Sequence, residues 1–204
     1  MAFLPIMSNG TRVYAGFWKR FCAVLLDFCI IALFGLLFIW LEGFGRTLAI
    51  IIAIPSSLLF QVYSIFFNAR FGGTPGKLLV GIRITKPDGS QIGWPEAWKR
   101  SAVDIAFNLI ILLVTILALI RVDPIQYVAL PFMKRMFLLQ TLWPSWYGLV
   151  IPFQQVWFWS NIAFLLIDKR KRALHDLIAG TIVVEKAFAE YPSTGQFPAM
   201  TPDE

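Results

Sequence analysis

The sequence has 204 residues, of which 58% are hydrophobic and only 15% are charged. A soluble domain carries about 25% charged residues, so this composition excludes an ordinary soluble protein and favours one embedded in a membrane. The net charge is +6, and we expect the basic side of the protein to face anionic lipid headgroups.

Four apolar runs are each long enough to cross a bilayer, which takes about 20 residues in a helix. They cover residues 21–41, 47–67, 101–120 and 145–167. A short polar leader, residues 1–19, precedes them, and a tail, residues 185–204, is expected to be disordered because it is rich in proline and poor in apolar residues. The sequence therefore predicts an all-α polytopic membrane protein with four transmembrane helices and a membrane domain over residues 20–184.

Residues 71–94 form a long polar segment between the second and third spans. Apolar residues alternate at Val80, Ile82 and Ile84, which is typical of a half-buried strand. The turn Pro87-Asp88-Gly89 would lead residues 90–92 back as a second strand. An isolated hairpin is only marginally stable, so we expect residues 181–184 to add a third strand to a small cytoplasmic sheet.

Residues 121–144 lie between the third and fourth spans. Lys134 and Arg135 interrupt their apolar residues, and three prolines divide them. This pattern is poor for a span and favours a segment that lies in the membrane interface.

The positive charges predict the orientation, because Lys and Arg concentrate on the cytoplasmic side of membrane proteins. With four spans, fourteen of the 18 Lys and Arg residues fall on the side that holds both termini and the hairpin segment. The other side has Arg46, Arg121, Lys134 and Arg135. We therefore expect both termini in the cytoplasm and the protein in the plasma (inner) membrane.

Three polar residues inside the spans form the candidate site for binding an ion or a proton: Asp27 in the first span, and Asp104 and Asn108 in the third. An ionised Asp at the bilayer centre costs about 2.5–3.5 kcal/mol, so it needs a partner or a function. We expect Asp27 to bind an ion or a proton, with oxygens from Asp104 and Asn108 at a similar depth. The alternative is a set of interhelical hydrogen bonds that fixes packing. For Asp104 that alternative is favoured, since Arg100 lies four residues earlier on the same helix.

Three further charged residues are placed at the cytoplasmic mouth of the spans. We predict that Asp176 pairs there with Arg20 or Arg100, because the planar guanidinium group binds a carboxylate with two parallel hydrogen bonds. Arg20 would also guard the entrance to Asp27. His175 is the only histidine, and we expect it to make a structural hydrogen bond rather than bind a metal.

The turn at residues 73–77 contains Gly73, Pro75 and Gly76. Its spacing is too short for a phosphate-binding loop, and a strand rather than a helix is expected after it. We interpret the glycines as a structural turn at the membrane surface.

Several of these features together resemble the RDD family of small membrane proteins. They are Arg20, Asp27, the Gly-Thr-Pro-Gly-Lys turn, and Leu-His-Asp at residues 174–176 followed by Ala-Gly-Thr at residues 179–181. The arginine and two aspartates that name the family map to Arg20, Asp27 and Asp176, and the resemblance covers residues 14–184 with an interruption at 121–143. It implies a membrane protein suspected of transport, for which exchange of cations and protons is one proposal.

The sequence contains no nucleophile–base pair, carboxylate dyad or metal-ligand cluster, so we expect neither an enzyme nor a cofactor. The basic residues lie close to span ends, which favours contact with lipid over nucleic acid. Two hypotheses remain. One is a small ion-coupled transporter of a small cation, homo-oligomeric because four spans enclose a narrow pathway. The other is a non-transporting scaffold that binds lipid or a partner protein. They differ in whether Asp27 faces a hydrated cavity or a dry helix contact.

Overall fold

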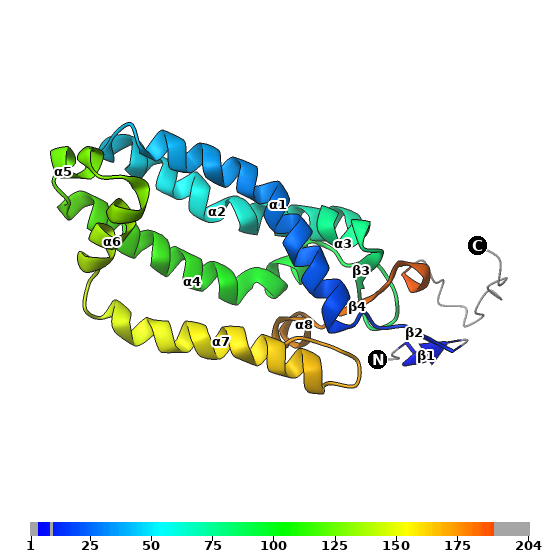
Figure 1. Ribbon diagram of the computed structural model, residues 1–204. Coiled ribbons are helices and arrows are strands. Elements are labelled where there is room, and N and C mark those ends of the chain that lie inside the picture. The colour runs from blue at the N-terminus through cyan, green and yellow to red at the C-terminus, as the bar shows by residue number, and fades with distance from the viewer. Residues whose placement is uncertain (1–3, 9, 190–204) are drawn as a thin grey trace.

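The computed structural model describes residues 4–8 and 10–189 (Figure 1). Four long helices dominate it: α1 (Phe17–Glu42), α2 (Arg46–Phe71), α4 (Trp94–Arg121) and α7 (Tyr147–Ile167). All four are long and apolar enough to span a membrane. The predicted fold class, a helical protein with four spans, is therefore confirmed.

Local sequence explains where α2 ends and where α4 begins. Gly72 stops α2 by adopting a left-handed conformation, with φ of 72°. Glu96 stabilises the first turn of α4, because its carboxylate accepts a hydrogen bond of 2.8 Å from the Gly93 N–H. Pro95 lies in the first turn of α4, where a helix does not need its missing N–H. As a result, α4 starts seven residues before the predicted span.

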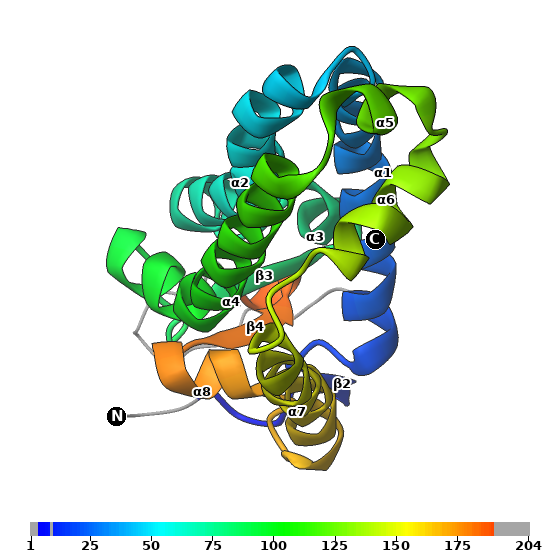
Figure 2. The same cartoon turned by 90° about the vertical axis from the view of Figure 1, so that its left-hand side faces the viewer.

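The helices form an open bundle with two different ends (Figures 1 and 2). Helix α2 packs against both α1 and α4. All the strands lie at one end, which we call the sheet end. The connection between α4 and α7 lies at the other, which we call the loop end.

The sheet end contains helix α3 (Pro75–Leu79), strand β3 (Ile82–Thr85), helix α8 (Leu174–Ala179) and strand β4 (Ile182–Glu185). Strands β3 and β4 pair antiparallel, with Ile82 opposite Glu185 and Thr85 opposite Ile182. The predicted pairing between the middle and the end of the chain is thus confirmed. The strand starts later than expected, because residues 75–79 turn into α3 before it.

The second strand predicted at residues 90–92 is reduced to a single antiparallel bridge. Only Gln91 bridges to Thr85, because the chain after the turn soon enters α4. The free edge of β4 is covered instead by the leader, where the Ala15 N–H donates to the Val183 carbonyl oxygen at 3.0 Å.

The leader is therefore part of the fold rather than a polar extension. It forms strands β1 (Met7–Ser8) and β2 (Thr11–Arg12), and Val13 and Tyr14 are buried against β4. Beyond β4, a short 3₁₀ helix (Lys186–Phe188) buries Phe188. The rest of the tail predicted to be disordered, from residue 190 on, lies outside the described residues.

Two short helices lie at the loop end, α5 (Pro124–Ala129) and α6 (Phe132–Thr141). Both are too short to span a bilayer. Tyr127 of α5 and Leu139 of α6 pack on Ala49 and Ala53 of α2 and on the end of α4. The segment therefore covers one end of the bundle (Figure 2).

Candidate functional site

Asp27 of α1 is almost completely buried, with 3% of its surface exposed. Its carboxylate accepts three hydrogen bonds: from the Tyr63 hydroxyl at 2.8 Å, from the Thr74 hydroxyl at 2.5 Å and from the Gly76 N–H at 2.8 Å. We call these four residues the Asp27 site. All three donors are neutral, and the carboxylate lies in a contact between α1, α2 and the segment that leads into α3.

Gly76 makes this contact possible because α3 approaches α1 very closely. A Cβ atom at this position would lie 2.8 Å from the carboxyl carbon of Asp27 and closer still to the Ala23 carbonyl oxygen. A Cβ at Gly73 would make only ordinary contacts, the nearest at 3.4 Å. In the predicted glycine turn, Gly76 thus serves close approach, Pro75 starts α3, and Gly72 provides the left-handed turn.

Asp176 is fully buried at the sheet end, and it contacts both of the arginines predicted as alternatives. Arg20 of α1 donates from Nη1 to Oδ2 at 2.7 Å, and Arg100 of α4 donates from Nη1 to Oδ1. The Ala173 N–H donates to Oδ2 at 3.0 Å, so the same carboxylate also caps α8. We call Asp176, Arg20 and Arg100 the clasp. It joins two spans to α8.

The charges around the clasp change the ionisation of its neighbours. Burial opposes the ionisation of Asp176, but the charges of Arg100 and Arg20 outweigh burial and hold its pKa well below the usual range. Burial and the charge of Arg100 lower the pKa of His175 to about 3. The Nε2 atom of His175 lies 2.8 Å from Nη2 of Arg100. Neutral His175 accepts this hydrogen bond, since a guanidinium can only donate.

Lys77 of α3 is a further cation near the clasp. Its Nζ lies 3.4 Å from Oδ1 of the buried Asn68. Burial and the charge of Arg100 lower the pKa of Lys77 to about 7. Lys77 is therefore a group at the sheet end that can gain and lose a proton near neutral pH.

The other two predicted ion ligands have partners of their own. Trp157 of α7 donates from Nε1 to Asp104 Oδ1 at 2.7 Å, while Arg100 turns to the clasp instead of Asp104. The Asn108 side-chain N–H donates to the Ser57 carbonyl oxygen of α2 at 2.5 Å. Asp27, Asp104 and Asn108 thus bind three separate sets of partners. Among the described residues, no group of three or more His, Cys, Asp or Glu side chains could hold a metal ion.

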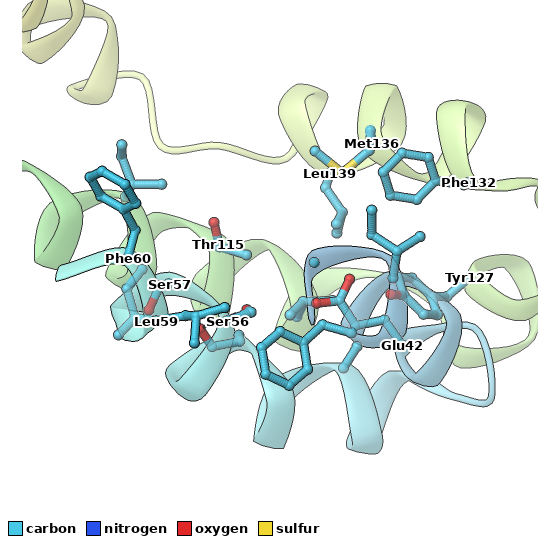
Figure 3. Close-up of a pocket in the computed structure, with 18 of the residues that line it drawn as sticks. Glu42, Ser56, Ser57, Leu59, Phe60, Thr115, Tyr127, Phe132, Met136 and Leu139 are labelled. Carbon is cyan, nitrogen blue, oxygen red and sulfur yellow. Dashed lines mark hydrogen bonds between the residues drawn. The ribbon is translucent and has the colours of Figure 1, made fainter. Parts of the chain in front are cut away.

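A cavity of about 360 Å³ lies toward the loop end, between α1, α2, α4 and the helices α5 and α6 (Figure 3). We call it the vestibule. Most of its lining is apolar, and its polar side chains are those of Glu42, Ser56, Ser57, Thr115 and Tyr127. In Figure 3 the Glu42 carboxylate lies between the α2 side chains and those of α6.

The vestibule ends close to the Asp27 site. Phe60 lines the cavity, and its ring centroid lies 6.4 Å from that of Tyr63, one turn further along α2. The Tyr63 hydroxyl in turn binds Asp27. Phe60 of the vestibule lining and Tyr63 of the Asp27 site are therefore neighbouring aromatic residues on α2.

The sequence did not identify Tyr63, Thr74, Lys77 or Glu42 as site residues. Thr74 and Lys77 stand within the recognised glycine turn, so their place in that motif was an available signal. Tyr63 lies 36 residues from Asp27, and only packing of α2 on α1 reveals the contact. Glu42 directly follows the first predicted span. An acidic residue at that place in a sequence resembles an ordinary charged residue of a loop.

The sequence model of the RDD family matches residues 14–180, a range that contains Arg20, Asp27 and Asp176. The chain is also 36% identical over 116 residues to "Uncharacterized protein YckC" of Bacillus subtilis (strain 168), which covers 53% of this chain and 74% of that protein. No solved structure matches the chain significantly. With its four apolar helices, this chain is an integral membrane protein that belongs to the RDD family.

Proposed function

We propose that the protein is a small transporter that exchanges monovalent cations for protons across the plasma (inner) membrane. The observation that carries this proposal is the position of the vestibule, which reaches to Phe60 and stops beside the Tyr63–Asp27 hydrogen bond. In this proposal the vestibule is open toward the loop end and stops short of the buried acid, as expected of a transporter that is closed on its other side.

In this proposal the dry Asp27 site is the closed state. The carboxylate would receive a cation or a proton only after Tyr63, Thr74 and Gly76 release it. Opening would therefore move α3 away from α1. Lys77, whose pKa lies near neutrality, sits on that same helix and supports coupling of the movement to protonation.

The charges support an orientation with the sheet end in the cytoplasm. At the loop end, Arg46 donates to the Val122 carbonyl oxygen at 3.1 Å, Arg121 to that of Leu142 at 3.3 Å and Arg135 to that of Glu42 at 3.3 Å. These arginines bind carbonyl groups at or near the ends of helices, where cations are stabilised. They are few, whereas fourteen of the 18 Lys and Arg residues lie on the sheet-end side of the spans, which supports a cytoplasmic position for that end.

We also propose a homo-oligomer, since four spans enclose only a narrow pathway and most of α7 is exposed. Anionic lipid would contact the sheet end of each copy.

The second candidate, a scaffold that transports nothing, is favoured by one observation: Asp27 has three donors and no access to the vestibule. In that case Asp27 would only fasten α3 to α1, and the sheet end would be the surface for lipid or a partner protein.

Flux through proteoliposomes separates the two candidates. Vesicles loaded with sodium are given a pH gradient, and sodium efflux and internal pH are followed together. We expect coupled movement with the wild type, loss of coupling in Asp27→Asn, and wild-type flux in Asp88→Asn, which changes an exposed turn. If Asp27→Asn does not fold, Tyr63→Phe keeps the carboxylate and should alter the pH dependence of flux. Wild-type vesicles that move no monovalent cation would rule out this transport and leave the scaffold.

A further inference from the structure

The Glu42 carboxylate is the one acidic group that lines the vestibule. Within residues 4–8 and 10–189 it forms no hydrogen bond or ion pair. Arg135, the nearby cation, donates instead to the Glu42 main-chain carbonyl oxygen. A partly buried acid without a direct partner, facing a cavity, can bind a ligand of opposite charge.

The walls around Glu42 have the chemistry of a cation site. Phe38, Phe60, Phe132 and Trp143 line the cavity with Tyr127, and aromatic faces attract cations. One such contact already exists, because the guanidinium of Arg135 lies 5.1 Å from the centre of the Tyr127 ring.

Two serine hydroxyl groups of the wall have their protons engaged by main-chain carbonyl oxygens. Ser56 donates its proton to the Ala53 carbonyl oxygen at 3.2 Å, and Ser57 donates to that of Ile54 at 2.9 Å. Their oxygens are left as acceptors, which suits a positively charged ligand and not an anion.

We propose that the vestibule binds an organic cation, a molecule with apolar groups around a positive charge that lies against Glu42. This inference rests on the proposed function, because it takes the vestibule as the entrance for substrate. A small hydrated ion would gain nothing from the apolar walls, and an uncharged acyl chain would leave Glu42 unpaired. A cavity of about 360 Å³ falls within the size range of small-molecule sites.

Equilibrium binding to the purified full-length protein tests the proposal without requiring transport. The probe is tetraphenylphosphonium, and tetraphenylborate is the control, with the same shape and the opposite charge. We expect tetraphenylphosphonium to bind saturably and tetraphenylborate not to compete. Glu42→Gln should weaken binding by about tenfold, because it removes the negative charge that faces the phosphonium ion. The matched control Glu185→Gln, in an exposed pair with Lys19 at the sheet end, should bind like the wild type.

Equal binding of both ions, or equal affinity in Glu42→Gln and wild type, would overturn the proposal. So would a copurified lipid, seen by native mass spectrometry, that the phosphonium ion does not displace. The comparison of both ions on the wild type needs no variant, so it decides the matter even if Glu42→Gln fails to fold. Binding without flux would leave this inference standing and reject the transporter. Sodium flux without binding would reject this inference alone.

Discussion

The Tyr63 hydroxyl donates a hydrogen bond of 2.8 Å to Oδ1 of Asp27, and this contact joins α2 to α1 where the vestibule ends. The same carboxylate accepts from Thr74 and Gly76, which lead into α3. One buried acid therefore holds two spans and the first helix of the sheet end together. Any movement that opens a path past Phe60 toward the sheet end must break at least one of these hydrogen bonds.

Gly76→Ala should destabilise the protein by about 1–3 kcal/mol, the usual cost of forcing an extra carbon into a packed site. The added Cβ would meet Asp27 and the backbone of α1. Gly73→Ala is the matched control, because its Cβ would make only ordinary contacts. Thermal unfolding in detergent measures both. Similar unfolding temperatures for the two variants would contradict the close approach of α3 to α1.

Asp176→Asn should destabilise the protein by about 3–5 kcal/mol, because it leaves two buried guanidinium groups without their carboxylate. Exchanging charges with one arginine should not restore stability. In the pair Asp176→Arg with Arg20→Asp, the new arginine would face Arg100. The double variant Asp176→Asn with Arg20→Gln removes one charge of each sign and should recover part of the loss. The unfolding temperatures of these variants measure the losses and any rescue. Full rescue by a single swap would show that only one arginine contacts Asp176.

His175 should make the protein sensitive to mild acid. Its pKa is lowered to about 3 in the folded protein and is about 6.5 when unfolded. Between these values the unfolded chain binds more protons, so stability falls as the pH drops below about 6.5. His175→Gln keeps an acceptor for Arg100 without this proton. Between pH 7.5 and pH 5, we expect the unfolding temperature of the wild type to fall further than that of His175→Gln. Equal falls in the two proteins would argue against a neutral His175 in the folded state.

Lys77 should make the stability of the protein rise with pH above neutrality. Its pKa is about 7 in the folded protein and about 10.4 when unfolded. Between these values the unfolded chain again binds more protons, so stability rises with pH. Lys77→Met keeps the apolar stem and removes the proton site, and it should flatten this rise between pH 7 and pH 9.5. A rise of the same size in Lys77→Met would assign it to another group.

The features that the sequence predicted well depend on local pattern. Four runs of apolar residues are visible without any structure, and alternation at Ile82 and Ile84 marks β3. The clasp was predicted because a planar guanidinium group suits a carboxylate, although one carboxylate shared by two arginines requires knowledge of packing.

The features that were missed depend on contacts between distant segments. Nothing in the leader sequence shows that Tyr14 completes the sheet beside Val184. The partners of Asp27 come from α2 and from the start of α3, because Gly76 lets α3 approach α1. The vestibule is formed by three spans, α1, α2 and α4, and two short helices, none of which has a pattern that predicts a cavity.

The most direct test of a path open at the loop end and closed at Asp27 is thiol labelling in intact cells. Cys22 and Cys29 are replaced with alanine, and single cysteines are placed at Ser57 in the vestibule, Asp123 at the loop end and Ser90 at the sheet end. A membrane-impermeant reagent added outside should modify Ser57→Cys and Asp123→Cys, and should reach Ser90→Cys only after the membrane is made permeable. Labelling of Ser90→Cys from outside, or of Ser57→Cys only from the cytoplasmic side, would contradict this orientation and the outward-open vestibule.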